Sequence, residues 1–211
     1  ILSTLFLQLG LPMSSYSANG LVTSLGSGGS ESGGASVLGF YTQFADPAKV
    51  SYTWNTSLPD SQRMFYTSDL ALYIGYVSEV RHLRAANPNL NFVVSPIPQS
   101  AVAKTKRVYG LLYTFMLPRG AKNTQGAYQA AIMLASSAGQ IAAQVTGLAP
   151  ANLNDLAQVH ATDPIATVSY ASALYSKGWL SPLSTATDQI FSGMIGSVIS
   201  GRSSLETALS T

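Results

Sequence analysis

The chain has 211 residues, a net charge of +2 and no cysteine. Hydrophobic residues make up 46% of the chain, which is enough for a sizeable core. Charged residues make up only 9%, which argues against the clustered basic surface that nucleic-acid binding requires. The absence of cysteine excludes disulfides, thiolate metal sites and a cysteine nucleophile.

The first third of the chain alternates short helices with polar loops. Residues 13–36 are rich in serine and glycine, which indicates a flexible loop or a loose hairpin, and their glycines match neither phosphate-binding pattern. An extended segment at 50–55 places Trp54 beside a polar turn. Helices are expected over residues 1–9, 37–44 and 60–66.

The segment 65–99 predicts two buried strands with a helix between them. The apolar runs at 70–74 and 91–94 have the length of strands, and the helix is expected over 79–86. In an open α/β sheet, ligands bind beyond the carboxyl ends of strands. The residues that follow the first strand are therefore candidate ligand contacts: Gly75, Tyr76, Ser78 and Glu79.

The second half of the chain begins with the apolar run 108–117, which predicts a buried strand and is too short to span a bilayer. The longest uncharged segment, 123–154, is interrupted by Gln, Ser, Gly and Asn and indicates an alanine-rich helix rather than a membrane span. Helices are expected over residues 124–144, 154–160, 164–176 and 187–200, and from 203 onward.

The order of these motifs resembles the extracellular solute-binding proteins of ABC importers, in the maltose-binding-like branch that takes sugars. The matching elements are Phe65, Ala71-Leu72, Gly75 to Ser78, Val80 to Ala86, Phe92 to Pro98, Gly147 to Pro150, Trp179, Pro182, Ile190 to Ile199, Gly201 and Ala208-Leu209. Many members of that family have glycine where Ser68-Asp69 stands. The resemblance runs from about residue 1 to 209 and corresponds to the C-terminal part of such a protein, so we expect the natural start to be missing.

The resemblance implies an α/β, periplasmic-binding-protein-like two-lobe fold with one lobe nearly complete and the second partial. Residues 1–104 with 165–211 would form the C-terminal lobe, and 105–164 the hinge crossing and the partial N-terminal lobe. Tyr109 and Gly110 would lie at the hinge crossing, and Phe191 where sugar-binding members place an aromatic platform. Trp179 and Trp54 complete the candidate ligand contacts.

The resemblance implies that the protein captures a small polar solute by hinge closure and delivers it to a membrane permease. A carbohydrate is the first candidate for this solute, and a polyol or another small polar solute is the second. Such a protein is a monomer outside the cytoplasm, in the periplasm or on the outer face of the membrane, with a lipid anchor as one option. It needs no cofactor or metal and binds no nucleic acid.

Catalysis is the weakest interpretation of the sequence. The two histidines, His82 and His160, are far apart in sequence. Among the acidic residues, Asp69 and Glu79 come closest to a catalytic pair, but their spacing is not typical of general acid/base catalysis. We therefore expect no enzyme. Two alternatives stay open: a surface interaction or adhesion domain on the same fold, and, for each candidate aromatic residue, ordinary core packing.

Overall fold

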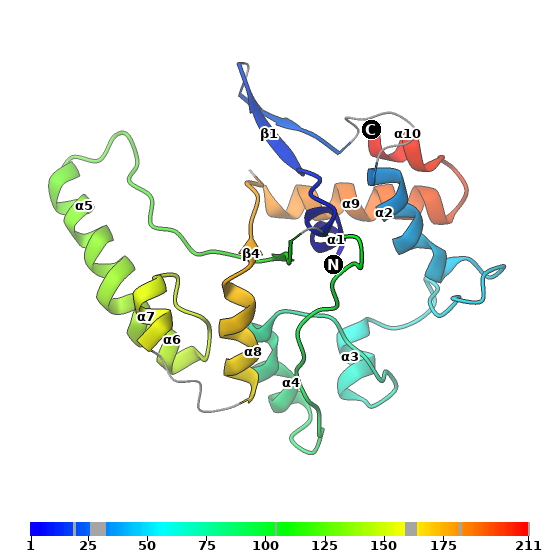
Figure 1. Cartoon of the computed structure of the whole chain (residues 1–211), viewed down its shortest axis with the longest axis horizontal. Coiled ribbons are helices and arrows are strands. Elements are labelled where there is room, and N and C mark those ends of the chain that lie inside the picture. The colour runs from blue at the N-terminus through cyan, green and yellow to red at the C-terminus, as the bar shows by residue number, and fades with distance from the viewer. Residues whose placement is uncertain (19, 26–32, 104, 159–163, 182, 211) are drawn as a thin grey trace. The chain divides into compact units, whose positions relative to one another are not determined.

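The computed structural model describes residues 1–18, 20–25, 33–103, 105–158, 164–181 and 183–210 (Figure 1). The chain divides into two compact units. Unit 1 holds Ile1–Asp60, Pro98–Tyr109 and Lys177–Thr211, and unit 2 holds Ser61–Ile97 and Gly110–Ser176. These divisions do not coincide with the lobes expected from the sequence, whose bounds stay a prediction.

Unit 1 is built mainly from helices that come from both ends of the chain. Its elements are α1 (Leu2–Gln8), β1 (Ser14–Ser17), β2 (Gly20–Thr23), α2 (Gly33–Thr42), the 3-10 turn η1 (Gln43–Ala45), β3 (Val108–Tyr109), α9 (Ser184–Ile199) and α10 (Leu205–Ser210). The two-residue strand β3 pairs with β4 (Ser176–Lys177).

The core of unit 1 joins α1, α2, α9 and α10. Phe6 and Leu38 are its two fully buried large side chains, and Met194 and Leu209 pack into the same cluster. Full burial of a side chain of this size contributes about 1.5–3 kcal/mol. This cluster holds the N-terminal and C-terminal segments of the chain together.

The serine-rich and glycine-rich segment 13–36 forms a hairpin, one of its two expected structures, only over residues 14–23. Residues 33–36 belong to α2, so the helix expected over 37–44 begins four residues earlier than predicted. β1 and β2 are antiparallel, with Ser14 opposite Thr23 and Ser17 opposite Gly20. Residues 26–32 lie outside the described part of the chain.

The helices α1 and α9 each end at a glycine. Gly10 has φ +73° directly after α1, and the N–H of Leu11 bonds to the carbonyl of Phe6. Gly201 has φ +69° after α9, and the N–H of Arg202 bonds to the carbonyl of Ser197. This left-handed conformation suits glycine because it has no Cβ, and the bonds satisfy carbonyls at the helix end.

Unit 2 consists of short helices and long extended segments. Its helices are α3 (Ser61–Tyr66), η2 (Val77–Glu79), α4 (Val80–Ala86), α5 (Thr124–Met133), the π-helical turn η3 (Leu134–Ala138), α6 (Gly139–Thr146), α7 (Leu153–Gln158) and α8 (Pro164–Ala173). The helices expected near 60–66, 79–86, 124–144, 154–160 and 164–176 are confirmed, with ends shifted by a few residues where they lie inside the described part of the chain.

Ser68 closes α3 in a conformation that is unusual for a residue with a side chain. Its φ is +69°, and the N–H of Asp69 reaches back to the carbonyl of Met64. Glycine is the usual residue at this position after a helix, because a Cβ costs about 1–2 kcal/mol in the left-handed region. The turn at Ser68 is therefore strained locally.

The strands expected at 70–74 and 91–94 are wrong, and the strand expected over 108–117 is wrong beyond Tyr109. These segments are apolar, but a strand also needs a hydrogen-bonded neighbour. Among the described residues none pairs with them, and strands make up only 6% of the structure. No large sheet is therefore described, and the α/β two-lobe fold stays a prediction.

Candidate ligand-binding site

Two of the predicted aromatic residues meet in unit 1. The rings of Trp179 and Phe191 lie with their centroids 6.1 Å apart at an interplanar angle of 47°, and both are half-buried against the core. The indole N–H of Trp179 donates to the hydroxyl of Ser3 on α1, with 3.3 Å between the two atoms. Packing on one side and a hydrogen bond at the ring nitrogen fix the orientation of the indole.

Tyr109 is a third predicted residue in unit 1, and it is bonded to the same helix. Its backbone N–H donates to the hydroxyl of Thr4, at 3.1 Å, and Thr4 is buried. Ser3 and Thr4 are consecutive on α1, so Trp179 and Tyr109 are both attached to the first turn of that helix. We call Tyr109, Trp179 and Phe191, with Asp188, the aromatic cluster.

Asp188 belongs to this cluster and was not predicted from the sequence. Burial raises the pKa of the Tyr109 phenol, and the Asp188 carboxylate raises it further. Like any tyrosine phenol it is protonated at neutral pH and has an O–H that can donate, while the exposed carboxylate of Asp188 can accept. Asp188 lies three residues before Phe191 on α9, and that i,i+3 spacing on a helix could have pointed to it.

The predicted residues after 70–74 form a separate local structure in unit 2. The carboxylate of Glu79 accepts hydrogen bonds from the hydroxyl of Tyr73, at 2.7 Å, and from the N–H of Tyr76, at 3.1 Å. A Cβ at Gly75 would collide with that carboxylate and with the Tyr73 ring. Glu79 thus acts as a capping side chain at the start of η2, and Gly75 makes room for it.

The remaining predicted residues are not joined to either group. Trp54 is exposed in unit 1, and its backbone N–H bonds to the carbonyl of Phe44. Ser78 is exposed in η2. A Cβ at Gly110 would lie 3.0 Å from the Cβ of Ser176, so glycine at this position allows close packing of two backbone segments.

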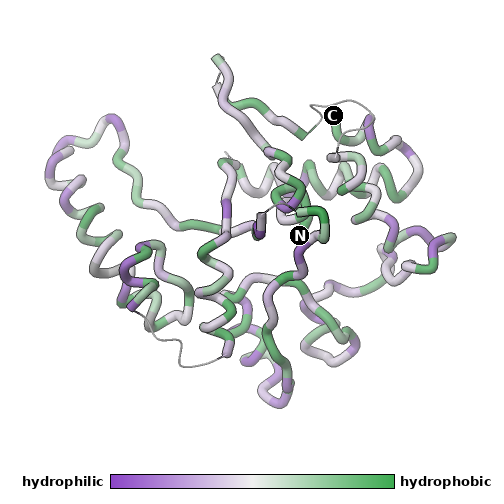
Figure 2. The backbone as a smooth tube through the Cα atoms, viewed as in Figure 1, coloured by the Kyte–Doolittle hydropathy of each residue, from purple (hydrophilic) through white to green (hydrophobic). Residues whose placement is uncertain are grey.

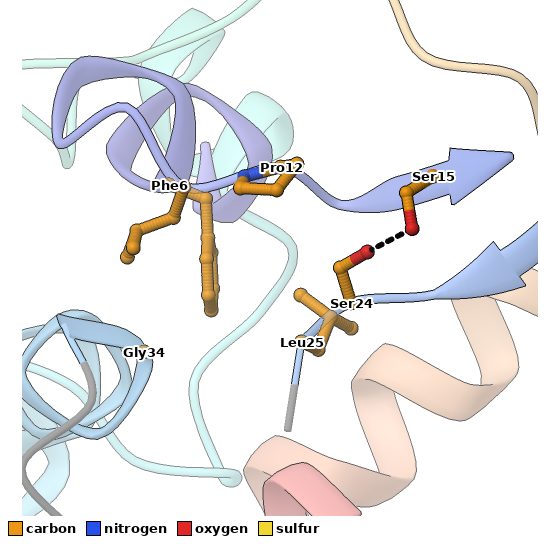
Figure 3. A pocket seen from close by; sticks show the side chains of 7 residues that line it. Phe6, Pro12, Ser15, Ser24, Leu25 and Gly34 are labelled. Atoms are coloured by element: carbon orange, nitrogen blue, oxygen red, sulfur yellow. Dashed lines mark hydrogen bonds between the residues drawn. The ribbon is translucent and has the colours of Figure 1, made fainter. Parts of the chain in front are cut away.

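A cavity of about 230 Å³ lies elsewhere in unit 1, between α1, the hairpin and α2 (Figure 3). Among the described residues that line it, the polar side chains are Ser15 and Ser24, whose hydroxyls bond to each other at 3.0 Å. The cavity is lined by Phe6, Leu11, Pro12, Ser15, Ser24, Leu25 and Gly34. None of the predicted site residues lines it, and its apolar wall offers little to a polar solute.

Metal and membrane features are absent from the described part of the chain. No group of three or more His, Asp or Glu side chains is gathered among those residues. None of the described helices combines the length and the apolar character that crossing a membrane requires. His160 lies outside the described residues, and His82 is exposed on α4.

Comparison of the chain with protein-family models, with curated proteins and with solved structures finds no match.

Proposed function

We propose that the chain is the extracytoplasmic solute-binding component of an ABC importer, which captures a small polar solute and delivers it to a membrane permease. The observation that carries the proposal is the aromatic cluster in unit 1. The rings of Trp179 and Phe191 are in contact there, and Tyr109 is bonded through its backbone to the same helix as Trp179. The Asp188 carboxylate lies near enough to raise the pKa of the Tyr109 phenol.

The chemistry of this cluster fits a carbohydrate better than other small solutes. Aromatic rings stack on the C–H faces of sugar rings, and a phenol and a carboxylate bond to hydroxyl groups. The phenol of Tyr109 is protonated and the carboxylate of Asp188 is exposed, so one group donates and the other accepts. A strongly anionic solute would meet repulsion from Asp188 instead.

Two further observations support the proposal. The chain passes from one compact unit to the other between Tyr109 and Gly110, and binding proteins that close by hinge motion use such connecting segments. Ser68 has a backbone conformation that favours glycine, the residue that many members of the resembling family carry at that turn.

The test is a fluorescence titration of the chain with Trp54→Phe, which leaves Trp179 as the single tryptophan. Pools of oligosaccharides, polyols, amino acids and peptides are added in turn. We expect a saturable change in emission with the oligosaccharide pool. Tyr109→Phe and Asp188→Ala should each weaken that binding by about tenfold, since each removes one hydrogen bond to the ligand, one of them charge-assisted.

Gln189→Ala is the matched control, because Gln189 is the exposed neighbour of Asp188 on α9 and is not part of the aromatic cluster. It should leave the affinity unchanged. A protein that is folded by circular dichroism yet silent with every pool would contradict the proposal. That result would favour the alternative of a surface interaction domain that does not transport.

A further inference from the structure

The loop over residues 46–60 of unit 1 contains a short motif that the proposed function does not use. Asn55-Thr56-Ser57 matches the pattern Asn-x-Ser/Thr of an acceptor for N-linked glycosylation, in which x is any residue except proline. Of the eight asparagines of the chain, Asn55 alone has Ser or Thr two positions later. The pattern therefore points to a single position.

An acceptor for a bulky sugar group must lie at the surface of the protein. Thr56, Ser57 and Leu58 are all exposed. Residues 46–60 are all described and none belongs to a helix or strand, so a transferase can bind this backbone without breaking regular structure. The loop carries both polar and apolar residues, as the purple and green stretches of Figure 2 show.

The motif forms a tight turn around the side chain of Asn55. The N–H of Ser57 donates to Oδ1 of Asn55, at 2.9 Å, and the N–H of Leu58 donates to the backbone carbonyl of Asn55, at 3.2 Å. An asparagine that accepts from the backbone two residues on forms an Asx turn. The turn keeps the carboxamide and Ser57 close together, and these are the two groups that define the acceptor pattern.

The amide nitrogen of Asn55 is compatible with an attached sugar. Its Nδ2 donates to the hydroxyl of Tyr52, at 3.1 Å, at an exposed position. A primary amide has two N–H donors. Attachment of a sugar replaces one hydrogen on Nδ2 and leaves the other for the bond to Tyr52. The folded loop can therefore keep this contact after modification.

Exposed aromatic rings lie next to the attachment atom. Tyr52 is 40% exposed and Trp54, directly before Asn55, is 41% exposed. Aromatic faces stack on the C–H faces of sugar rings. The hydroxyl of Tyr52 is already in hydrogen-bond contact with Nδ2 of Asn55, so the ring lies within reach of the first sugar. A glycan would thus cover apolar surface that unit 1 leaves exposed.

From these observations we infer that Asn55 is an acceptor for N-linked glycosylation, with an oligosaccharide on a polyprenyl diphosphate as the donor. Nδ2 of Asn55 attacks the anomeric carbon of the first sugar. The bond from that carbon to the diphosphate oxygen breaks, and its electron pair leaves with the polyprenyl diphosphate. One amide proton passes to a base of the transferase, and nothing is oxidised or reduced. The inference shares with the proposed function only a location outside the cytoplasm.

The experiment incubates the purified, folded chain with the lipid-linked oligosaccharide and a single-subunit oligosaccharyltransferase that needs no acidic residue before the asparagine. Mass spectrometry should show one glycan per chain, on the peptide that contains Asn55. Peptide-N-glycosidase should release it and leave an aspartate at that position. Asn123 provides an internal comparison: it is exposed and followed by Thr124, but Gln125 stands two positions on, so it should stay unmodified.

Two variants separate the motif from the loop that carries it. Ser57→Ala should lower the glycosylated fraction by at least about tenfold, because it removes the hydroxyl that the pattern requires. It keeps the backbone N–H that bonds to Asn55, so the turn is retained. Thr56→Ala is the matched control: it removes a neighbouring exposed hydroxyl at the position that the pattern leaves open, and the glycosylated fraction should not change.

Three results would overturn the inference. A folded chain without glycan, while a peptide of residues 50–60 is modified, would show that the loop does not present Asn55. Absence of glycan from both would show that the motif is not an acceptor. Equal losses in Ser57→Ala and Thr56→Ala would show that the transferase does not read the motif. None of these results affects the proposed function, because the titration with solute pools involves no transferase.

Discussion

A buried glutamine ties α1 to a distant segment of unit 1, and its removal gives a quantitative test of the structure. The side chain of Gln8 is only 4% exposed. Its Nε2 donates to the carbonyl of Pro98, at 2.9 Å, and its Oε1 accepts from the N–H of Ser100, at 3.0 Å. Gln8→Ala would leave both backbone groups without this partner.

The expected loss of stability follows from the two backbone groups that Gln8→Ala leaves without a hydrogen-bond partner. A buried donor or acceptor that loses its partner costs about 1–3 kcal/mol. Both bonds are only partly buried, so water can partly hydrate the two unsatisfied backbone groups. We therefore expect Gln8→Ala to lower the free energy of unfolding of unit 1 by about 2–3 kcal/mol.

Urea unfolding followed by tryptophan emission measures this change, because Trp54 and Trp179 both lie in unit 1. Gln43→Ala is the control. The Gln43 amide donates to the carbonyl of Phe40 in an exposed bond and accepts only a long bond of 3.5 Å from the Ser51 hydroxyl, so its loss should cost less than about 0.5 kcal/mol. If the free energies of unfolding of the two variants differ by less than about 0.5 kcal/mol, the reasoning about unsatisfied backbone groups is refuted.

The remaining predictions concern pH and backbone strain. Burial raises the pKa values of Tyr41 and Tyr109 in the folded state, so the stability of unit 1 should be full below pH 10, where the unfolded phenols begin to ionise, and fall as the pH rises toward the folded-state values. Urea midpoints measured at several alkaline pH values check this. If the urea midpoint of a variant with both tyrosines replaced by phenylalanine falls with pH as steeply as that of the unaltered chain, the prediction is contradicted. Ser68→Gly should raise the stability of unit 2 by up to about 1 kcal/mol, because the gain in the left-handed region exceeds the added entropy of the unfolded chain. Circular dichroism in urea measures it, with Ser68→Ala as the variant that should show no gain.

Helices of this chain are largely readable from its sequence, because their signals are local. A glycine follows the C-cap residue of α1 and of α9, and it marks where each of these helices ends. The boundary near Tyr66 and the helix after Tyr76 follow from local turn residues in the same way.

The strands could not be predicted correctly, because pairing is not a local property. Residues 70–74 and 91–94 have the composition of buried strands, and composition says nothing about whether a neighbouring strand is present. The apolar run 108–117 fails for the same reason after its first two residues.

The candidate site was predictable in part. Tyr109, Trp179 and Phe191 were selected from motif order, and the structure brings Trp179 and Phe191 into contact. Glu79 was selected as a polar residue after an expected strand, whereas its carboxylate accepts a hydrogen bond from the N–H of Tyr76 in the local turn. Its role could not be derived from position alone, because an acidic residue at a helix start caps the helix as readily as it binds a ligand.

The order in which the core of unit 1 is assembled has a consequence for biosynthesis. Phe6 and Leu38 belong to segments that leave the ribosome before the segments that carry Met194 and Leu209. Roughly 140 residues separate the end of α2 from the start of α9, which takes about 7–30 s to translate. During that interval the apolar faces of α1 and α2 lack their final cover. The nascent chain thus presents these two helices to cellular chaperones until α9 and α10 emerge.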